Sequence, residues 1–81
     1  MDDKQKHALV LLENARKAVM REQDFQTSLM QTKFDAQPHA TELVNYEVKI
    51  MRSRNRLDKL QKAYTEMLTQ YVDTYPDEEQ D

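Results

Sequence analysis

Apolar residues recur along the first half of the chain with the spacing of one helical face. No proline or glycine interrupts the chain before Pro38, and the apolar positions are separated by steps typical of an amphipathic helix. A carboxylate at Asp2 or Asp3 can cap the free amides of a helix start. The pattern predicts a helix over about residues 3–35, interrupted on its apolar stripe by Glu22. That stripe consists of Ala8, Leu11, Leu12, Ala15, Ala18, Val19, Phe25 and Leu29.

The second half carries a more regular heptad pattern. Every seventh residue from Leu43 is apolar, namely Leu43, Ile50, Leu57, Tyr64 and Tyr71. The companion positions are Tyr46, Ser53, Leu60, Met67 and Thr74. Heptads sustained over this length are typical of coiled coils. They predict a second helix over about residues 39–75, followed by an acidic flexible tail at 76–81.

The segment 34–40 is the one turn that the sequence indicates. Proline favours the first turn of a helix and pushes the preceding residue out of helical geometry, and we expect Asp35, Gln37 or Thr41 to cap the second helix. A short connection makes the two helices antiparallel neighbours. The expected fold is therefore all-α, a single antiparallel two-helix hairpin over residues 1–75. Because one hairpin cannot cover all of its apolar residues, we expect it to dimerise into a four-helix bundle.

Composition narrows the classes of function. The 81 residues include no glycine and no cysteine, which argues against phosphate-binding loops, nucleophile elbows, disulfides and thiolate metal sites. The two histidines, His7 and His39, fall at opposite ends of the hairpin, and no carboxylate pair shares a cleft that would separate two pKa values. We therefore expect no enzyme activity, no metal and no cofactor. The apolar runs are too short to span a membrane, and the expected location is cytoplasmic.

Folding the hairpin brings surplus apolar residues together at both of its ends, and such surfaces usually mark interfaces. The expected partner-binding residues at the open end are Leu9, Val10, Leu12, Tyr71, Val72 and Tyr75. Those expected at the turn end are Met30, Phe34, Val44, Val48 and Met51. The partner is expected to be a protein: a second copy, forming a homodimer, or an acidic protein of another kind.

The middle of the second helix is basic, although the formal net charge of the chain is −3. We expect Arg52, Arg54 and Arg56 to steer an acidic target toward the hairpin. A nucleic-acid-binding hairpin is the alternative that these bases suggest. It is disfavoured because the termini are acidic and no aromatic residue lies between the arginines for base stacking.

Glu22 and Ser53 interrupt the two apolar stripes at nearly facing levels. One interpretation is a buried polar layer that fixes the register of the helices. The other, which the sequence favours, is that Glu22 reaches the edge of the interface and meets an arginine.

Pro38 followed by Leu43-Val44-Asn45-Tyr46-Glu47-Val48-Lys49-Ile50 resembles the needle subunits of type III secretion systems, which are helical hairpins with a proline turn followed by a leucine and a tyrosine. The small cytosolic co-chaperones of those needles are similar in size, acidity and form. The resemblance implies a structural subunit or co-chaperone of a helical assembly. The chain departs from the needle pattern at its acidic C-terminus, where needle subunits have an apolar helix. The principal expectation is thus a non-catalytic protein-binding module: an adaptor, small chaperone or inhibitor that packs against a partner helix.

Overall fold

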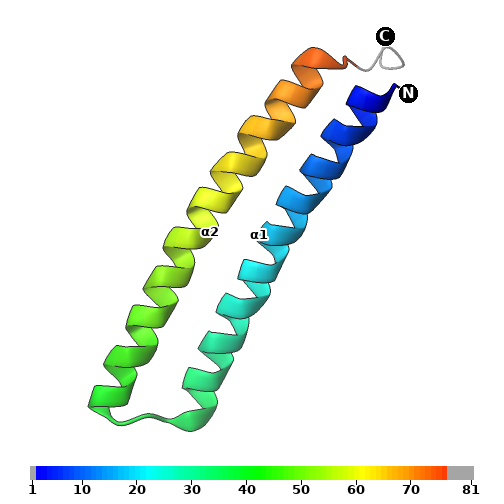
Figure 1. Ribbon diagram of the computed structural model, residues 1–81. Coiled ribbons are helices and arrows are strands. Elements are labelled where there is room, and N and C mark those ends of the chain that lie inside the picture. Colours follow the sequence, from blue (N-terminus) through cyan, green and yellow to red (C-terminus); the bar gives the residue numbers. More distant parts are fainter. Residues whose placement is uncertain (1, 77–81) are drawn as a thin grey trace.

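The computed structural model describes residues 2–76 as an antiparallel hairpin of two long helices (Figure 1). Helix α1 spans Asp3–Ala36 and helix α2 spans Ala40–Thr74, and the described residues contain no strand. The start of α1 and the end of α2 lie side by side, opposite the turn. The predicted all-α hairpin is confirmed. The predicted acidic tail falls, from residue 77 onward, outside the described residues.

The start of α1 follows directly from the sequence. Asp2 is the N-cap residue, and its Oδ1 accepts a hydrogen bond of 2.7 Å from the backbone N–H of Gln5. Asp3 adds a negative charge in the first turn, where the helix dipole favours it. The capping aspartate thus satisfies one of the amides that a helix start leaves free.

The turn differs from the sequence prediction in how α2 is capped. Gln37 adopts left-handed geometry (φ 44°, ψ 59°) and ends α1, while His39 precedes α2 without a side-chain capping bond. Asp35 belongs to α1 and accepts a hydrogen bond from Gln31, and Thr41 is already inside α2. The expectation that Asp35, Gln37 or Thr41 caps α2 is therefore wrong. Gln37 occupies the left-handed position that ends α1. Only two residues therefore remain before α2 begins.

The interface between the helices follows a strict heptad on both sides. On α2, Ile50 and Ser53 are buried and most of the other predicted heptad positions are half-buried. On α1, the repeat that faces α2 is Gln5, Ala8, Leu12, Ala15, Val19, Glu22, Gln26, Leu29 and Lys33. Leu11 and Phe25 are 43% and 47% exposed, so their assignment to the apolar stripe is wrong. Four polar residues hold seam positions of α1 instead.

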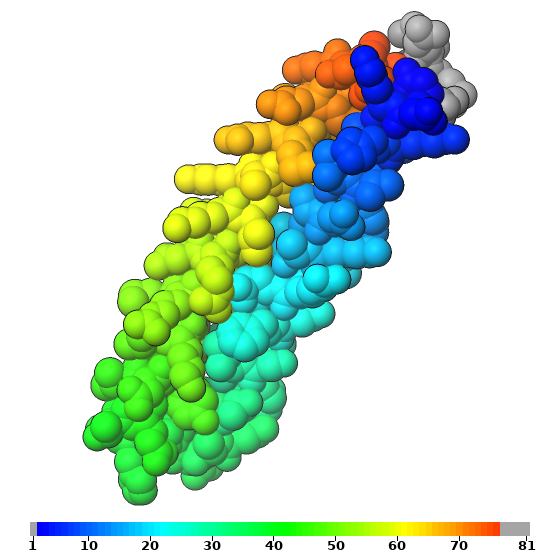
Figure 2. All heavy atoms as spheres, in the orientation of Figure 1, coloured from blue at the N-terminus to red at the C-terminus, as the bar shows by residue number. Residues whose placement is uncertain are grey.

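The apolar core of this hairpin is thin. Among the described residues, only Leu12, Val19 and Ile50 are buried apolar side chains. The molecule is a rod of 57 × 24 × 16 Å with a radius of gyration of 18.1 Å (Figure 2), against about 12 Å for a compact domain of this length. Its accessible surface is 6721 Å², whereas a compact monomer of this mass exposes about 5,100 Å². Much of the apolar surface therefore remains available for contacts outside the hairpin.

Candidate protein-binding interface

The seam between the helices divides the surface into two flanks of different chemistry. One flank, here called the apolar face, carries Leu9, Met20, Met30, Phe34, Val44, Met51, Leu68 and Val72 at the heptad positions next to the seam. The opposite flank, here called the basic face, carries Lys4, Arg21, Lys49, Arg52, Arg56 and Lys59. Two observations fix the assignment. Met30 and Arg54 line one groove on the apolar side, and the Arg56 guanidinium lies 5.7 Å from the Phe25 ring on the other.

An open groove begins between the helices at the turn end of the apolar face and extends over α2. One part, of about 240 Å³, is lined by Met30 and Phe34 of α1 together with Leu43 and Ile50 of α2. It continues along α2 into a second part of about 420 Å³, lined by Val44, Val48 and Met51 among others. This turn-end groove contains all five apolar residues that the sequence predicted for this end. The structure brings them together from both helices.

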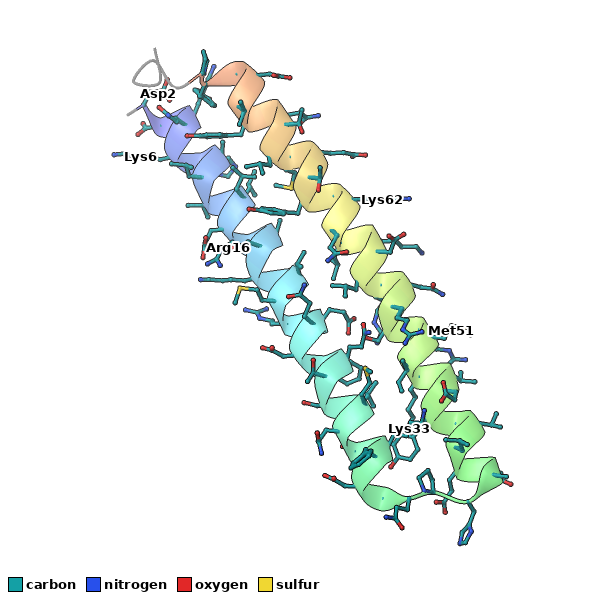
Figure 3. The ribbon with its side chains drawn as sticks, turned by 180° about the vertical axis from the view of Figure 1, so that it is seen from behind. Asp2, Lys6, Arg16, Lys33, Met51 and Lys62 are labelled. Atoms are coloured by element: carbon teal, nitrogen blue, oxygen red, sulfur yellow. The ribbon has the colours of Figure 1, made fainter. Side chains whose placement is uncertain are left out.

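The side chains of the turn-end groove are largely uncovered. Phe34 is 79% exposed, Val44 60% and Met51 55%. In Figure 3, the labelled Met51 projects from α2 on the side away from α1, whereas Lys33 points across toward α2. Lys33 pairs with Glu47 at the edge of the groove, and Arg54 borders its far end. The groove is therefore apolar along its length and bordered by charges of both signs.

The predicted residues of the open end divide into three groups. Leu12 is buried against α2, so it mainly stabilises the hairpin and leaves little surface for a partner. Val10 and Val72 are 56% and 55% exposed, and Leu9 is half-buried. Tyr71 and Tyr75 are half-buried, with ring centroids 5.2 Å apart.

Tyr71 is also held within the hairpin by a hydrogen bond. The amide of Gln5 donates from Nε2 to the Tyr71 hydroxyl over 3.0 Å. Beside the tyrosine pair is a shallow groove of about 270 Å³, which Leu11 and Leu12 help to line. The tyrosines thus close the open end of the seam, and their outer edges remain accessible.

The three arginines predicted to act together do not share a face. Residues two apart on a helix differ by about 200° in direction, and Arg54 borders the turn-end groove while Arg56 covers Phe25. Arg52 lies one turn from Arg56 and belongs with it on the basic face. The basic face as a whole holds six bases, listed above, against four acids, Asp35, Glu42, Glu66 and Asp73.

A polar layer crosses the middle of the seam. Ser53 is fully buried, and its Oγ donates a 3.1 Å hydrogen bond to Oε2 of Glu22. The Nε of Arg56 donates a 2.5 Å hydrogen bond to the other carboxylate oxygen. The side chain of Glu22 is 11% exposed and that of Arg56 is 51% exposed. Glu22 therefore pairs with an arginine at the edge of the interface, which is the interpretation that the sequence favoured. It also accepts a hydrogen bond from the buried serine, which is a feature of the alternative interpretation, a buried polar layer.

These contacts shift the titration of Glu22. The hydrogen bond from Arg56, reinforced by the one from Ser53, holds the pKa of the Glu22 carboxyl below its ordinary value of 4.5, although partial burial acts in the opposite direction. At neutral pH the layer is thus a negative carboxylate compensated by a surface guanidinium. Such a group stabilises and orients the hairpin, and it lacks the raised pKa that a general acid needs near neutral pH.

Met20 and Leu68 belong to the apolar face, but neither was among the residues expected to bind a partner. Met20 is 47% exposed and Leu68 41%, and neither lies in the groups expected at the two ends. Both follow from the heptad once the true α1 seam is known, because each lies beside the seam on the side of Met30. The sequence did not reveal which residues of α1 face α2, because polar residues occupy several of those heptad positions.

Within residues 2–76, no group of three or more histidine and acidic side chains is placed to hold a metal ion. Neither of the described helices contains an apolar stretch long enough to cross a membrane. Comparisons with protein family models, with characterised proteins and with solved structures find no significant match. The chain's own surface is therefore the basis for a functional proposal.

Proposed function

We propose that this protein is a non-catalytic binding module that packs its apolar face against a helix of a protein partner, in the manner of an adaptor, small chaperone or inhibitor. The observation that carries the proposal is the turn-end groove, in which Phe34, Val44 and Met51 are all more than half exposed. Contiguous exposed apolar surface on a small protein usually marks an interface. A cytosolic site of action, consistent with a chain without cysteine, is part of the proposal.

The shape of the groove suits a helical ligand. Its first part lies between the two antiparallel helices and its second part lies on α2, so a third helix can lay a stripe of apolar residues along it. Covering a large apolar side chain contributes about 1.5–3 kcal/mol. Phe34, Val44 and Met51 together would contribute at most about 9 kcal/mol, which is comparable to the cost of association, so a bound partner must also cover further parts of the apolar face. The bordering charges, Lys33 with Glu47 and Arg54, would fix the orientation of that partner.

A photo-crosslinking amino acid placed at two matched aromatic positions tests this proposal. Phe34 lies on the apolar face and Phe25 on the basic side, and both are exposed, at 79% and 47%. With benzoylphenylalanine replacing Phe34, irradiation in cells should give discrete protein adducts, which mass spectrometry then identifies. The same substitution at Phe25 should give few. Equal labelling at both positions, or none at Phe34, would refute binding through the apolar face.

The basic face supports a second candidate function, the recruitment of an acidic protein segment. Its six bases exceed its four acids in the described structure, which creates a positive field on one flank of a chain with a net charge of −3. For a partner identified as above, Arg52→Glu with Lys59→Glu should slow association at low salt and leave helicity unchanged. Association kinetics that do not respond would exclude electrostatic steering. A salt-dependent shift of labelled RNA instead would favour nucleic acid as the ligand of this face.

A further inference from the structure

We infer that the occupant of the apolar face is a second copy of this chain, packed antiparallel so that the two turns lie at opposite ends of a four-helix bundle. The inference rests on the proposed function and names the partner of the same face. In this arrangement α1 packs on α1 of the second copy and α2 on α2, about one twofold axis perpendicular to the rod. Three observations carry it: the charge of the face, the spacing of its apolar residues on each helix, and the register between the helices.

The charge of the two flanks selects the apolar face for self-association. The apolar face carries three bases, Lys6, Arg16 and Arg54, and three acids, Glu13, Glu47 and Asp58. It is therefore formally neutral, and a copy of itself meets it without net repulsion. The basic face has an excess of two positive charges over the described residues. Two copies of that face would repel each other, so a symmetric contact leaves it on the outside.

The apolar residues of α1 are spaced symmetrically about Met20. Leu9 lies eleven residues before Met20 and Met30 lies ten residues after it. When two α1 helices run antiparallel with their Met20 residues side by side, Leu9 of one copy faces Met30 of the other. Lys6 then faces Phe34 of the second copy, fourteen residues from Met20 in the other direction. In the dimer this contact would place the ammonium group of Lys6 beside the ring of Phe34, which is exposed in the single hairpin.

The residues of α2 have a matching centre at Asp58. Val44 and Val72 lie fourteen residues on either side of it, so in an antiparallel pair each valine faces the other valine of the second copy. The two centres, Met20 and Asp58, lie at the same height along the rod. The ion pair between Glu22 and Arg56 shows this directly, because each member lies two residues from its helix's centre, toward the turn. One axis can therefore satisfy both helices at once.

The charges near that axis are compatible with the contact. The two copies of Asp58 meet at the axis, where they would repel each other if alone. Arg54 lies one helical turn from Asp58 on the same face, so each aspartate has the Arg54 guanidinium of the second copy within reach of a long side chain. Lys62, 3.8 Å from Asp58, adds further compensation from the same chain. Two symmetric Arg54–Asp58 pairs would thus define the register.

The surface available is sufficient for a stable dimer. A standard specific interface buries about 1,600 Å² in total, or about 800 Å² on each partner. Each hairpin exposes 6721 Å², about 1,600 Å² more than the mass of the chain predicts for a compact monomer. A face that extends along a 57 Å rod can supply the required area.

Cysteine crosslinking tests the register, because the natural chain has no cysteine to interfere. Met20→Cys, treated with a short bismaleimide, should give a covalent dimer in high yield. Asn14→Cys, exposed on the other flank of α1, is the matched control and should stay monomeric. A mixture of Val44→Cys and Val72→Cys chains carrying different tags should crosslink only between the two types. Within one chain these positions are roughly 42 Å apart, at 1.5 Å per residue.

The crosslinking outcomes separate the possible arrangements. Dimers from Val44→Cys alone, with none from the mixture, would mean that both turns lie at the same end and would overturn the inferred register. No crosslinks at Met20 or in the mixture would exclude the dimer through this face. If Phe34 nevertheless labels a different protein in the photo-crosslinking experiment, the proposed function holds and only the second copy as partner is excluded.

A charge introduced at the axis gives an independent measurement by sedimentation. Met20→Glu places two additional like charges side by side in the dimer and should raise the dissociation constant at least a hundredfold. Asn14→Glu makes the same charge change on the opposite flank and should leave the constant within about threefold. Because Met20 is 47% exposed in the hairpin, both variants should retain the helicity of the natural chain. Equal dissociation constants for the two variants would overturn the inference.

Discussion

Glu22 shows how a polar residue is accommodated in a seam that would otherwise be apolar. Its two carboxylate oxygens have different partners, the buried hydroxyl of Ser53 and the surface guanidinium of Arg56. Burial of an unpaired carboxylate would be costly, but here each oxygen accepts a hydrogen bond. The layer therefore favours one alignment of the helices, because sliding by a heptad would separate all three residues.

The titration of Glu22 makes hairpin stability depend on pH. Its folded-state pKa is held below the ordinary value of 4.5, mainly by Arg56. A depressed pKa adds stability that is fully present above the unfolded value and is lost as pH falls through the folded one. Glu22→Gln should therefore lower the unfolding free energy by about 1–2 kcal/mol at pH 7. The difference from the natural chain should shrink as pH falls below 4.5 and vanish once pH is below the lowered folded-state pKa, as measured by urea unfolding.

Glu47→Gln provides the comparison for Glu22. The pKa of Glu47 is also lowered, through its ion pair with Lys33, but its side chain is 55% exposed. Solvent screening should keep the effect of Glu47→Gln well below that of Glu22→Gln at neutral pH. If the two variants lose equal stability, the buried hydrogen bond to Ser53 contributes nothing.

The sequence identified Glu22 and Ser53 as the residues that break the two stripes, because each interrupts a periodic pattern. It could not identify the pairing arginine. Several arginines lie within reach of that level, and the choice depends on which flank of the seam each helix presents. The same ambiguity led to the grouping of Arg52, Arg54 and Arg56, although residues two apart on a helix point in nearly opposite directions.

At the scale of the helices, the sequence predicted which residues of α2 face α1, but it did not predict which residues of α1 face α2. The α2 heptad is marked by Ile50, Leu57 and Leu60, so hydrophobicity alone reveals its register. In α1 the seam passes through Gln26 and Lys33, while Phe25 lies outside it beneath Arg56. An apolar-residue search therefore selects the wrong face for part of α1. The turn and the helix bounds follow from Asp2 and Pro38, whose effects on backbone geometry are local.

Gln26 allows the seam assignment of α1 to be tested. Its Oε1 is buried and, among the residues that the structure describes, finds no hydrogen-bond donor. Gln26→Leu removes that unsatisfied acceptor and adds apolar contact with α2. It should raise the unfolding free energy by about 1–2 kcal/mol, measured by chemical denaturation. Gln31→Leu, the same change at an exposed position of α1, should alter stability by less than about 0.5 kcal/mol. Equal gains would place Gln26 outside the seam.

At the scale of the whole molecule, the two flanks would have separate roles. If the apolar face is taken up by a second copy, both basic faces remain exposed on opposite sides of the bundle. An acidic partner would then bind a preformed dimer at two equivalent sites, and the two proposals would be compatible. A head-to-tail filament would use the ends of the hairpin instead, and its light scattering would continue to grow with concentration.

Thermal unfolding as a function of protein concentration distinguishes these assemblies. A closed dimer that is more stable than its separate hairpins has a melting temperature that rises with concentration, because dissociation accompanies unfolding. For two chains of 81 residues the rise should be about 4 °C for each tenfold increase. Met20→Glu should melt at a lower temperature that does not depend on concentration, since it leaves only the thin core of Leu12, Val19 and Ile50. Circular dichroism over a hundredfold range of concentration measures both. A melting temperature of the natural chain that stays constant would show that one hairpin is stable alone, and its apolar face would then be free for a different protein.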